Sequence, residues 1–111
     1  MIFILDQLQS LPGQGKALHD LCREVYLPAA AERGLTLVHS LVSPPLWLDD
    51  DSNMLFFLWS LPDAKAFWRK NELGRRDPAV HDWWAQVDRL TMSRDRRTLA
   101  DPADFDRLAG G

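Results

Sequence analysis

The strongest constraint on the fold is a repeat in which an apolar strand pattern leads through a proline turn into a helical region. Residues 2–8 lead into Pro12 and Gly13 before the first helical region, and residues 54–59 lead into Pro62 before the second. Further strand patterns follow each helical region, so the order predicts a βαββαβ unit, an α+β protein with a four-stranded antiparallel sheet. The helices of such a unit cover only one face of the sheet. We therefore expect the other face to need a partner, and we predict a homodimer.

The expected elements follow from hydrophobic periodicity and from helix-breaking residues. Apolar residues from Leu18 to Val25 recur at i, i+3, i+4 and i+7, which is one helical stripe, and Pro28 is expected to kink or split that helix. Gly74 is expected to interrupt the second helical region, and Asp77-Pro78 to start a new helix. The predicted strands span residues 2–9, 35–42, 54–60 and 91–99, and the predicted helices span 16–33 and 63–71 and begin again at 77.

The length and the single cysteine set limits on the architecture. A chain of 111 residues can form one domain whose core needs no disulfide or metal. Because Cys22 is the only cysteine, an intrachain disulfide and a multi-cysteine zinc site are excluded. We expect a single domain over residues 1–100 and a tail over 101–111, in which Phe105 and Leu108 either pack on a neighbour or stay loose.

Charge and hydropathy exclude several classes of partner. A formal net charge of −3 argues against a general nucleic-acid binder, which needs concentrated positive charge. The apolar start is too short for a signal peptide, and no stretch approaches the roughly 18 apolar residues of a membrane span. We therefore expect a cytoplasmic protein that has neither nucleic acid nor membrane as a partner.

The common cofactor and metal motifs are missing from the sequence. It contains no phosphate-binding glycine loop, no dinucleotide fingerprint, no HExxH pair and no nucleophile elbow. We therefore predict no cofactor and no metal. Any catalysis is expected to rely on a shaped aromatic pocket, one or two acid–base groups, and oxygen or an activated substrate.

Three residues are candidates for catalysis. His81 borders the apolar stripe of the last helix near Trp84, where it can act as a general base near neutral pH, or can be a surface histidine bonded to a nearby aspartate or water. Tyr26, the only tyrosine, either orients a substrate oxygen or caps a carbonyl. Asp6 in the first strand is the other candidate for orienting the substrate.

A histidine in the second strand is a candidate for substrate binding. His39 replaces a leucine in an alternating pattern, on the face that carries Leu37 and Leu41. A polar group buried there needs a partner or it costs stability. We expect either a structural histidine bonded to Asp6 or Gln7, or one that lines a pocket or the dimer interface.

The tryptophans and the late arginines complete the candidate binding set. Trp59, Trp68 and Trp84 fall where strand and helices should meet, and aromatic walls suit flat apolar ligands, although aromatics at helical spacing also form cores. Arg94 and Arg96 share one face of the last strand. Because an arginine fork matches a carboxylate, we predict that Arg94 faces the ligand, with a solvated surface position as the alternative.

Four segments resemble the NIPSNAP-like group of dimeric α+β barrel proteins. They are residues 2–13, residues 57–60 followed by Asp63, Asp77-Pro78 with the tryptophan pair that follows, and residues 94–99. The resemblance implies a ferredoxin-like protomer whose sheet pairs face to face with a second copy. It also implies a pocket within each protomer, between sheet and helices. The chain departs from the group at Asp6, where arginine is frequent, and at Pro44-Pro45, so no catalytic set is carried over.

The resemblance also guides the expected activity. Related dimeric barrels include cofactor-independent monooxygenases, lactone isomerases, haem-degrading enzymes and polyketide cyclases. We predict that the chain binds a small apolar or aromatic molecule and performs cofactor-independent proton transfer or oxygenation on it, as an isomerase, cyclase or monooxygenase does. The alternatives are a non-catalytic ligand-binding or dimeric interaction protein, and a haem-binding or haem-degrading protein with His81 as the axial ligand.

Overall fold

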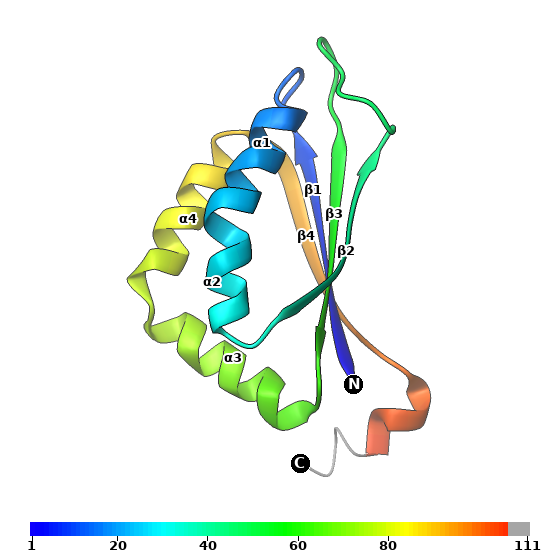
Figure 1. Ribbon diagram of the computed structural model, residues 1–111, viewed down its shortest axis with the longest axis vertical. Helices are drawn as coiled ribbons and strands as arrows, with labels where there is room; N and C mark the ends of the chain where they lie inside the picture. Colours follow the sequence, from blue (N-terminus) through cyan, green and yellow to red (C-terminus); the bar gives the residue numbers. More distant parts are fainter. Residues whose placement is uncertain (107–111) are drawn as a thin grey trace.

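The computed structural model describes residues 1–106, apart from the side chain of Ala79, and consists of one sheet with helices on one of its faces (Figure 1). Leu108 of the predicted tail lies outside the described residues. The strands are β1 (Ile2–Ser10), β2 (Thr36–Ser43), β3 (Met54–Leu61) and β4 (Thr91–Ala100). The helical elements are α1 (Gly15–Leu21), the π-helical η1 (Cys22–Tyr26), α2 (Leu27–Glu32), α3 (Ala64–Arg76), α4 (Pro78–Asp88) and the 3₁₀ turn η2 (Pro102–Asp104).

The sheet has the strand order β2-β3-β1-β4, and each neighbouring pair is antiparallel. The predicted βαββαβ order and four-stranded antiparallel sheet are therefore confirmed. The two central strands, β1 and β3, both alternate between buried and half-buried residues. Since side chains alternate between the two faces of a strand, the buried set, which includes Ile4, Asp6 and Trp59, faces the helices.

The first helical region runs from Gly15 to Glu32 as α1, η1 and α2. Pro28 has no N–H to donate to the carbonyl four residues earlier, so regular α-helical bonding cannot pass through it. The helix accommodates the proline by widening: the N–H of Leu27 bonds to the carbonyl of Cys22, five residues back. The predicted disturbance is thus present, but it lies in the turn before Pro28 and leaves the helix continuous.

The prediction that Gly74 interrupts the second helical region was wrong, because α3 continues through it to Arg76. A glycine inside a helix costs only about 1 kcal/mol relative to alanine, so the rest of the helix can carry it. The helix ends because Asp77 precedes Pro78 and takes an extended conformation, with φ −98° and ψ 108°. The predicted start of a new helix at this point is confirmed by α4.

The predicted inward position of His39 was also wrong. The register between β2 and β3 shifts between Leu37 and His39, so one residue is bulged and the alternation slips by one position. Leu37 pairs with Trp59 on the helix-facing side, whereas His39 pairs with Leu58 on the opposite side and is exposed. Of the alternatives for this histidine, the hydrogen bond to Asp6 or Gln7 is therefore not formed, whereas a place in the dimer interface stays a prediction.

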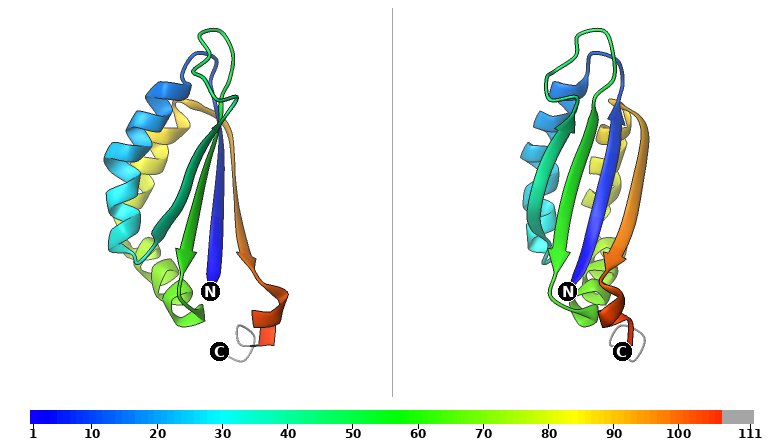
Figure 2. Two further views of the ribbon diagram at one scale, coloured as in Figure 1. Left: turned by 45° about the vertical axis from the view of Figure 1, so that its right-hand side comes forward. Right: turned by 90° about the vertical axis from the view of Figure 1, so that its right-hand side faces the viewer.

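The helices and the inner face of the sheet enclose the core, and the outer face has no helical cover (Figure 2). Buried side chains of the helices pack on buried side chains of the strands; they are Leu18, Tyr26, Trp83 and Val87 against Ile4, Leu8, Leu55, Phe57 and Trp59. The outer face carries the half-buried or exposed apolar side chains Phe3, Leu5, Leu41, Phe56 and Leu58. Within residues 1–106, no helix has the length and apolar character needed to cross a membrane.

Candidate functional site

A buried carboxylate at the centre of the sheet organises the candidate site. Asp6 in β1 is only 2% exposed and points toward the helices. A carboxylate in such a position must be paired and hydrogen-bonded to be tolerated. Tyr26 Oη donates to its Oδ2 at 2.8 Å, and Trp59 Nε1 donates to the same oxygen at 3.0 Å. Arg96 donates through Nε to Oδ1 at 2.6 Å and through Nη2 to Oδ2 at 3.1 Å.

Each donor reaches Asp6 from a different element. The β1–β4 register places Arg96 directly opposite Asp6, and β3, on the other side of β1, supplies Trp59. Tyr26 is the last residue of η1, so the widened turn delivers its phenol to the sheet. Arg96 Nη2 also donates to Tyr26 Oη, which closes the group. Such π-helical turns occur frequently at functional sites.

Burial and charge fix the protonation states of these groups. Burial, followed by the negative charge of Asp6, raises the pKa of the Tyr26 phenol, so that it stays a hydrogen-bond donor. Burial works against the Arg96 cation, but its hydrogen bonds to Asp6 and Tyr26 and the negative charge of Asp6 outweigh this effect and raise the Arg96 pKa. Burial and Asp6 raise the pKa of the neighbouring Cys22 thiol to about 12, so this thiol is unreactive.

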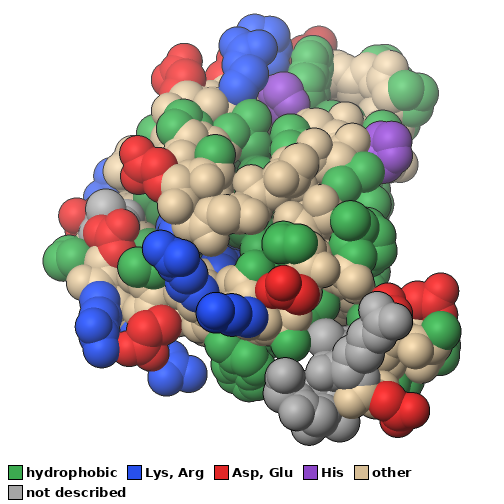
Figure 3. Space-filling view, turned by 60° about the horizontal axis from the view of Figure 1, so that its bottom comes forward, with side chains coloured by type: hydrophobic (Ala, Val, Ile, Leu, Met, Phe, Trp, Pro, Cys, Tyr) green, Lys and Arg blue, Asp and Glu red, His purple; other side chains and the backbone are tan. Residues whose placement is uncertain are grey.

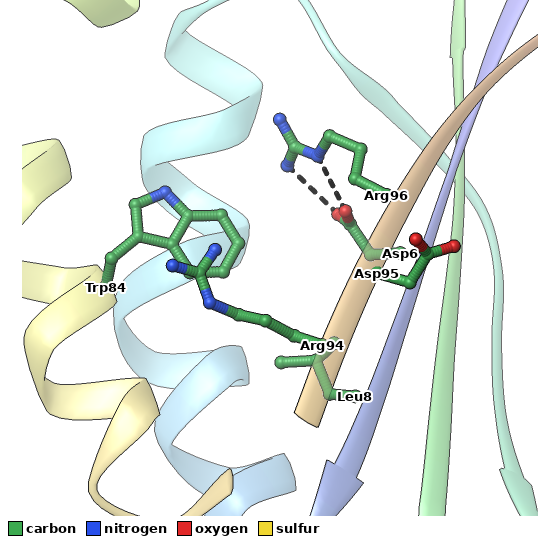
Figure 4. Close-up of a pocket in the computed structure, with 6 residues that line it drawn as sticks. All are labelled: Asp6, Leu8, Trp84, Arg94, Asp95 and Arg96. Carbon is green, nitrogen blue, oxygen red and sulfur yellow. Dashed lines mark hydrogen bonds and ion pairs between the residues drawn. The ribbon is translucent and has the colours of Figure 1, made fainter. Parts of the chain in front are cut away.

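A cavity of about 260 Å³ opens beside this group, and we call it the Trp84 pocket. The guanidinium carbon of Arg94 lies 3.9 Å from the ring centroid of Trp84, and Arg94 Nε donates to Asp88 Oδ1 at 2.8 Å. Figure 4 shows Arg94 flat against Trp84 and Arg96 paired with Asp6, whereas Asp95 points to the other side of β4. The residues that line the pocket are Asp6, Leu8, Trp84, Arg94, Asp95 and Arg96.

The Trp84 ring that lines this pocket is the outer end of a stack of three rings. The ring of Tyr26 stacks on Trp83 with centroids 4.0 Å apart, and Trp83 stacks on Trp84 at 4.3 Å. Trp83 is buried, whereas Trp84 is only partly buried and borders the cavity. The aromatic ladder therefore connects the buried carboxylate group to the open side of the pocket.

A second cavity, of about 390 Å³, lies on the other side of Trp84 and Arg96, and we call it the basic pocket. Basic side chains from α3, β4 and the end of α2 surround it, and exposed His81 of α4 lies at its edge. Figure 3 looks toward this end of the molecule and shows Lys and Arg side chains gathered over its helical half. The lining residues are Arg33, Lys70, Asn71, Gly74, Arg75, Val80, His81, Trp84 and Arg96.

The structure brings most of the sequence-predicted site residues together. Asp6, Tyr26 and Trp59 form the buried group, and Trp84 and Arg94 line the cavity next to it. His81 lines the adjoining basic pocket.

Two predicted binding residues lie elsewhere. His39 is on the outer face of β2. Trp68 of α3 is 60% exposed and lines a separate apolar hollow of about 410 Å³, together with Phe67 and Phe105. These two side chains do not border the Trp84 pocket, so neither one contributes to the site described here.

Sequence reasoning missed the basic residues that pair with Asp6 or line the basic pocket. Arg96 was recognised as sharing a face with Arg94 but not as the partner of Asp6; Lys70 was noted only as part of a basic cluster, and Arg33 was not predicted as a site residue. One signal was available for Arg96. An aspartate at an inward position of an apolar strand requires a cation, and the last strand presents two arginines on its inward face. No sequence pattern marks Lys70 as buried.

Metal binding gains no support from the side chains. Among the residues that the structure describes, no three His, Cys, Asp or Glu side chains converge on a common point. The donors around Asp6 are all N–H and O–H groups, which suits hydrogen bonding to oxygen atoms of an organic ligand.

Solved structures with the same architecture include NIPSNAP and oxygenase proteins. An uncharacterised NIPSNAP domain protein from Burkholderia xenovorans matches with 13% identity, 93% of this chain and 96% of that chain covered, and a TM-score of 0.72. A candidate antibiotic biosynthesis monooxygenase from Nitrosomonas europaea matches with 12% identity, 92% and 99% coverage, and a TM-score of 0.64. SnoaB, a cofactor-independent oxygenase from Streptomyces nogalater, matches with 11% identity, 91% and 92% coverage, and a TM-score of 0.56.

Sequence comparison alone gives no assignment. No protein-family model matches the chain, and no curated protein matches it either. The structural matches have low identity but cover nearly all of both chains, so they show a shared fold. They confirm, at this level, the resemblance seen in the strand and helix motifs. The chain therefore has the ferredoxin-like α+β fold of the NIPSNAP-like proteins.

Proposed function

We propose that the chain binds a small aromatic or apolar organic molecule with one acidic oxygen in the Trp84 pocket and performs cofactor-independent chemistry on it. The observation that carries this proposal is the pairing of a flat ring with fixed cations: Arg94 lies on Trp84, and Arg96 is held by Asp6 beside them. An apolar wall with a few convergent polar groups is the usual composition of a small-molecule site.

The same groups can stabilise an oxyanion that develops during a reaction. Asp6 holds Arg96 in place through two hydrogen bonds, so its guanidinium needs little reorganisation when charge forms nearby. Tyr26 remains protonated and contributes a phenol that supports both charged partners. In this scheme Asp6 and Tyr26 act by positioning Arg96, because the oxygens of Asp6 already accept four hydrogen bonds.

His81 is the candidate general base of this proposal. It is exposed and lines the basic pocket. That pocket and the Trp84 pocket share the side chains of Trp84 and Arg96 in their walls. A neutral imidazole could remove a proton from the ligand, which leads to isomerisation or cyclisation, or forms an enolate or phenolate that reacts with molecular oxygen. Two proteins of the same fold are described as oxygenases, which supports oxygenation by analogy of fold alone.

Native mass spectrometry of the protein purified from its own host tests ligand binding directly. We expect an adduct of a few hundred daltons, and we expect Trp84→Leu to lose it because the ring that supports Arg94 is removed. Trp47→Leu is the matched control, since Trp47 is 38% exposed and lies in the β2–β3 connection away from the pocket. Loss of the adduct in both variants, or in neither, would contradict the proposed site.

Replacement of His81 separates catalysis from simple binding. With the ligand identified, His81→Ala should reduce turnover by about 10²–10⁴-fold, as expected for loss of a general base, while the adduct is retained. Retained turnover would remove His81 from the mechanism. A wild-type protein that binds but never transforms the ligand would favour the carrier alternative. A Soret band that appears on haem titration and is lost in His81→Ala would favour the haem alternative.

We also propose that two copies pair through the outer face of the sheet. This face carries Phe3, Leu5, Phe56 and Leu58 on the central strands without helical cover (Figure 2), and soluble proteins rarely leave such a surface unpaired. Phe56→Glu should raise the dimer dissociation constant at least about 100-fold, because it places two carboxylates in the interface. Leu46→Glu, at a loop position 59% exposed, is the control. Sedimentation velocity measures both, and a wild-type monomer would refute the pairing.

The cellular location stays a prediction. The buried Cys22 thiol is consistent with a reducing compartment, but a buried thiol does not require one. Fractionation of the host cells, with detection of the protein in the cytoplasmic fraction, is the direct test.

A further inference from the structure

We propose that the basic pocket is a binding site for a doubly charged oxyanion group, held by Lys70 of α3, Arg33 at the end of α2 and Arg75 of α3. The shared ligand chemistry is a compact set of oxygens with two negative charges, supplied either by a tetrahedral group such as sulfate or phosphate or by two neighbouring carboxylates. This site is distinct from the Trp84 pocket, and the inference does not depend on the chemistry proposed there.

The first argument is the charge balance of the pocket walls. Its lining includes four cationic side chains, those of Arg33, Lys70, Arg75 and Arg96, together with His81 and no aspartate or glutamate. The carboxylate of Asp6 acts electrostatically on Lys70, but its oxygens are already occupied by Arg96 and by two neutral donors. Among the described residues, Arg96 is thus paired with Asp6, whereas Lys70, Arg33 and Arg75 have no carboxylate partner in the lining of this pocket.

The second argument is a largely buried lysine whose ammonium is unpaired. Lys70 is only 7% exposed, yet within residues 1–106 its ammonium makes no hydrogen bond and no ion pair. Its Nζ lies over the face of Phe67, 5.0 Å from the ring centroid. Lysine is almost never buried without a partner, because the charge loses its hydration. An anion in the pocket would supply that partner.

Arg33 gives independent support from the opposite wall. Its Nη1 atom is buried and has no hydrogen-bond partner in the described part of the chain. Arg33 also lines the cavity, so its guanidinium is a cation with N–H donors at the pocket wall. Because Arg33 follows α2 and Lys70 belongs to α3, the two cationic side chains line the cavity from separate elements, as binding of a group with several oxygens requires.

The protonation of Lys70 gives the site a measurable signature. Burial, followed by the charges of Arg96 and Arg33, lowers the Lys70 pKa to about 8, and Asp6 offsets this only in part. The other charged or titratable groups that face it are Arg75 on its own helix and His81 on α4. A bound dianion would favour the ammonium form, so binding near pH 8.5 should be accompanied by proton uptake.

Titration calorimetry with sulfate at constant ionic strength tests the proposal, because sulfate does not titrate near this pH. We expect one saturable site per chain and, at pH 8.5, a heat that depends on the buffer and reports proton uptake. Lys70→Met should weaken binding about tenfold or more, as expected for loss of a hydrogen bond to a charged group, and should abolish the proton uptake. Lys65→Met is the matched control: it is exposed on the same helix and does not line the pocket, so binding should stay within about twofold.

A second variant keeps the test independent of changes in the core. Arg75 is exposed, so Arg75→Gln should fold normally and still weaken sulfate binding several-fold. Parallel titrations with phosphate and malonate distinguish the two ligand sources: tighter binding of the tetrahedral ions assigns the site to such a group, and tighter binding of malonate assigns it to paired carboxylates. Absence of saturable binding by all three ions, or equal weakening by Lys70→Met and Lys65→Met, would overturn the proposal. The organic adduct expected in the Trp84 pocket is measured separately by mass spectrometry, so failure of sulfate binding does not count against the proposed function.

Discussion

The two pockets on either side of Trp84 and Arg96 differ in how their charges are balanced. In the Trp84 pocket each arginine has an acidic partner: Arg96 pairs with Asp6, and Arg94 pairs with Asp88. In the basic pocket, among residues 1–106, the ammonium of Lys70 forms no ion pair and one nitrogen of Arg33 has no hydrogen-bond partner. The protein thus fixes the geometry of the first pocket by its own ion pairs and leaves the second to be completed by a ligand. This difference predicts that removal of a charged side chain lowers the free energy of unfolding in the first pocket and raises it in the second.

Removal of the carboxylate from the balanced pocket should have the largest effect. Asp6→Ala is expected to lower the free energy of unfolding by about 3–5 kcal/mol, because Arg96 loses its counter-ion and the buried donors of Tyr26 and Trp59 lose their acceptor. Chemical denaturation monitored by circular dichroism measures this loss. Asp95→Ala is the control, since Asp95 is exposed in the same sheet, and it should change stability by less than about 0.5 kcal/mol. Equal losses of stability in Asp6→Ala and Asp95→Ala would show that the buried interactions of Asp6 do not stabilise the fold.

Removal of the unbalanced charge should have the opposite sign. Lys70→Met keeps a similar stem but eliminates a buried cation, and we expect the free energy of unfolding at pH 7 to rise by about 1–3 kcal/mol. The gain should shrink as the pH rises from about 8 toward the ordinary lysine pKa of 10.5, because the unfolded chain then holds a proton that the folded protein has released. Thermal unfolding between pH 7 and pH 10 follows this trend. A variant less stable than the wild type at pH 7 would show that Lys70 is already neutralised in the folded protein.

A change that leaves all charges in place should have the smallest effect. Gly74 lies inside α3, and a Cβ built on it meets nothing within 4 Å. Gly74→Ala should therefore raise the free energy of unfolding by about 0.5–1 kcal/mol through helix propensity alone. Sulfate affinity should not change, which calorimetry checks. A loss of affinity would show that the ligand needs the space beside this glycine.

The strands and the order of elements could be predicted from the sequence, because period-two alternation and the Pro12 and Pro62 turns are local signals. Two local expectations failed because tertiary structure overrides local preference. No glycine or proline marks the bulge after Leu37, so the outward turn of His39 could not be read from alternation. Gly74 could continue a helix because the cost of one glycine is small compared with the packing of the remaining turns.

The candidate site was predictable only in part, and the reason is distance along the chain. The inward position of Asp6 and the aromatic face around Trp84 follow from local periodicity. The pairing of Asp6 with Arg96 depends on the register of β1 against β4, ninety residues apart in sequence. The burial of Lys70 depends on how α3 packs against its neighbours. Neither the pairing of Asp6 with Arg96 nor the burial of Lys70 produces a recognisable sequence pattern within a single strand or helix.

The π-helical turn of residues 22–26 has a consequence for how this chain can tolerate insertions and deletions. Such a turn is equivalent to one additional residue inside an α-helix, and each residue of an α-helix turns the next side chain by about 100°. Deletion of one residue between Cys22 and Tyr26 would remove this additional residue and rotate one end of the helical segment against the other. Either Leu18 would leave the core or Ala30 would, although both are fully buried. The length of this turn is thus coupled to the whole helix, and sequence changes in it should be substitutions only.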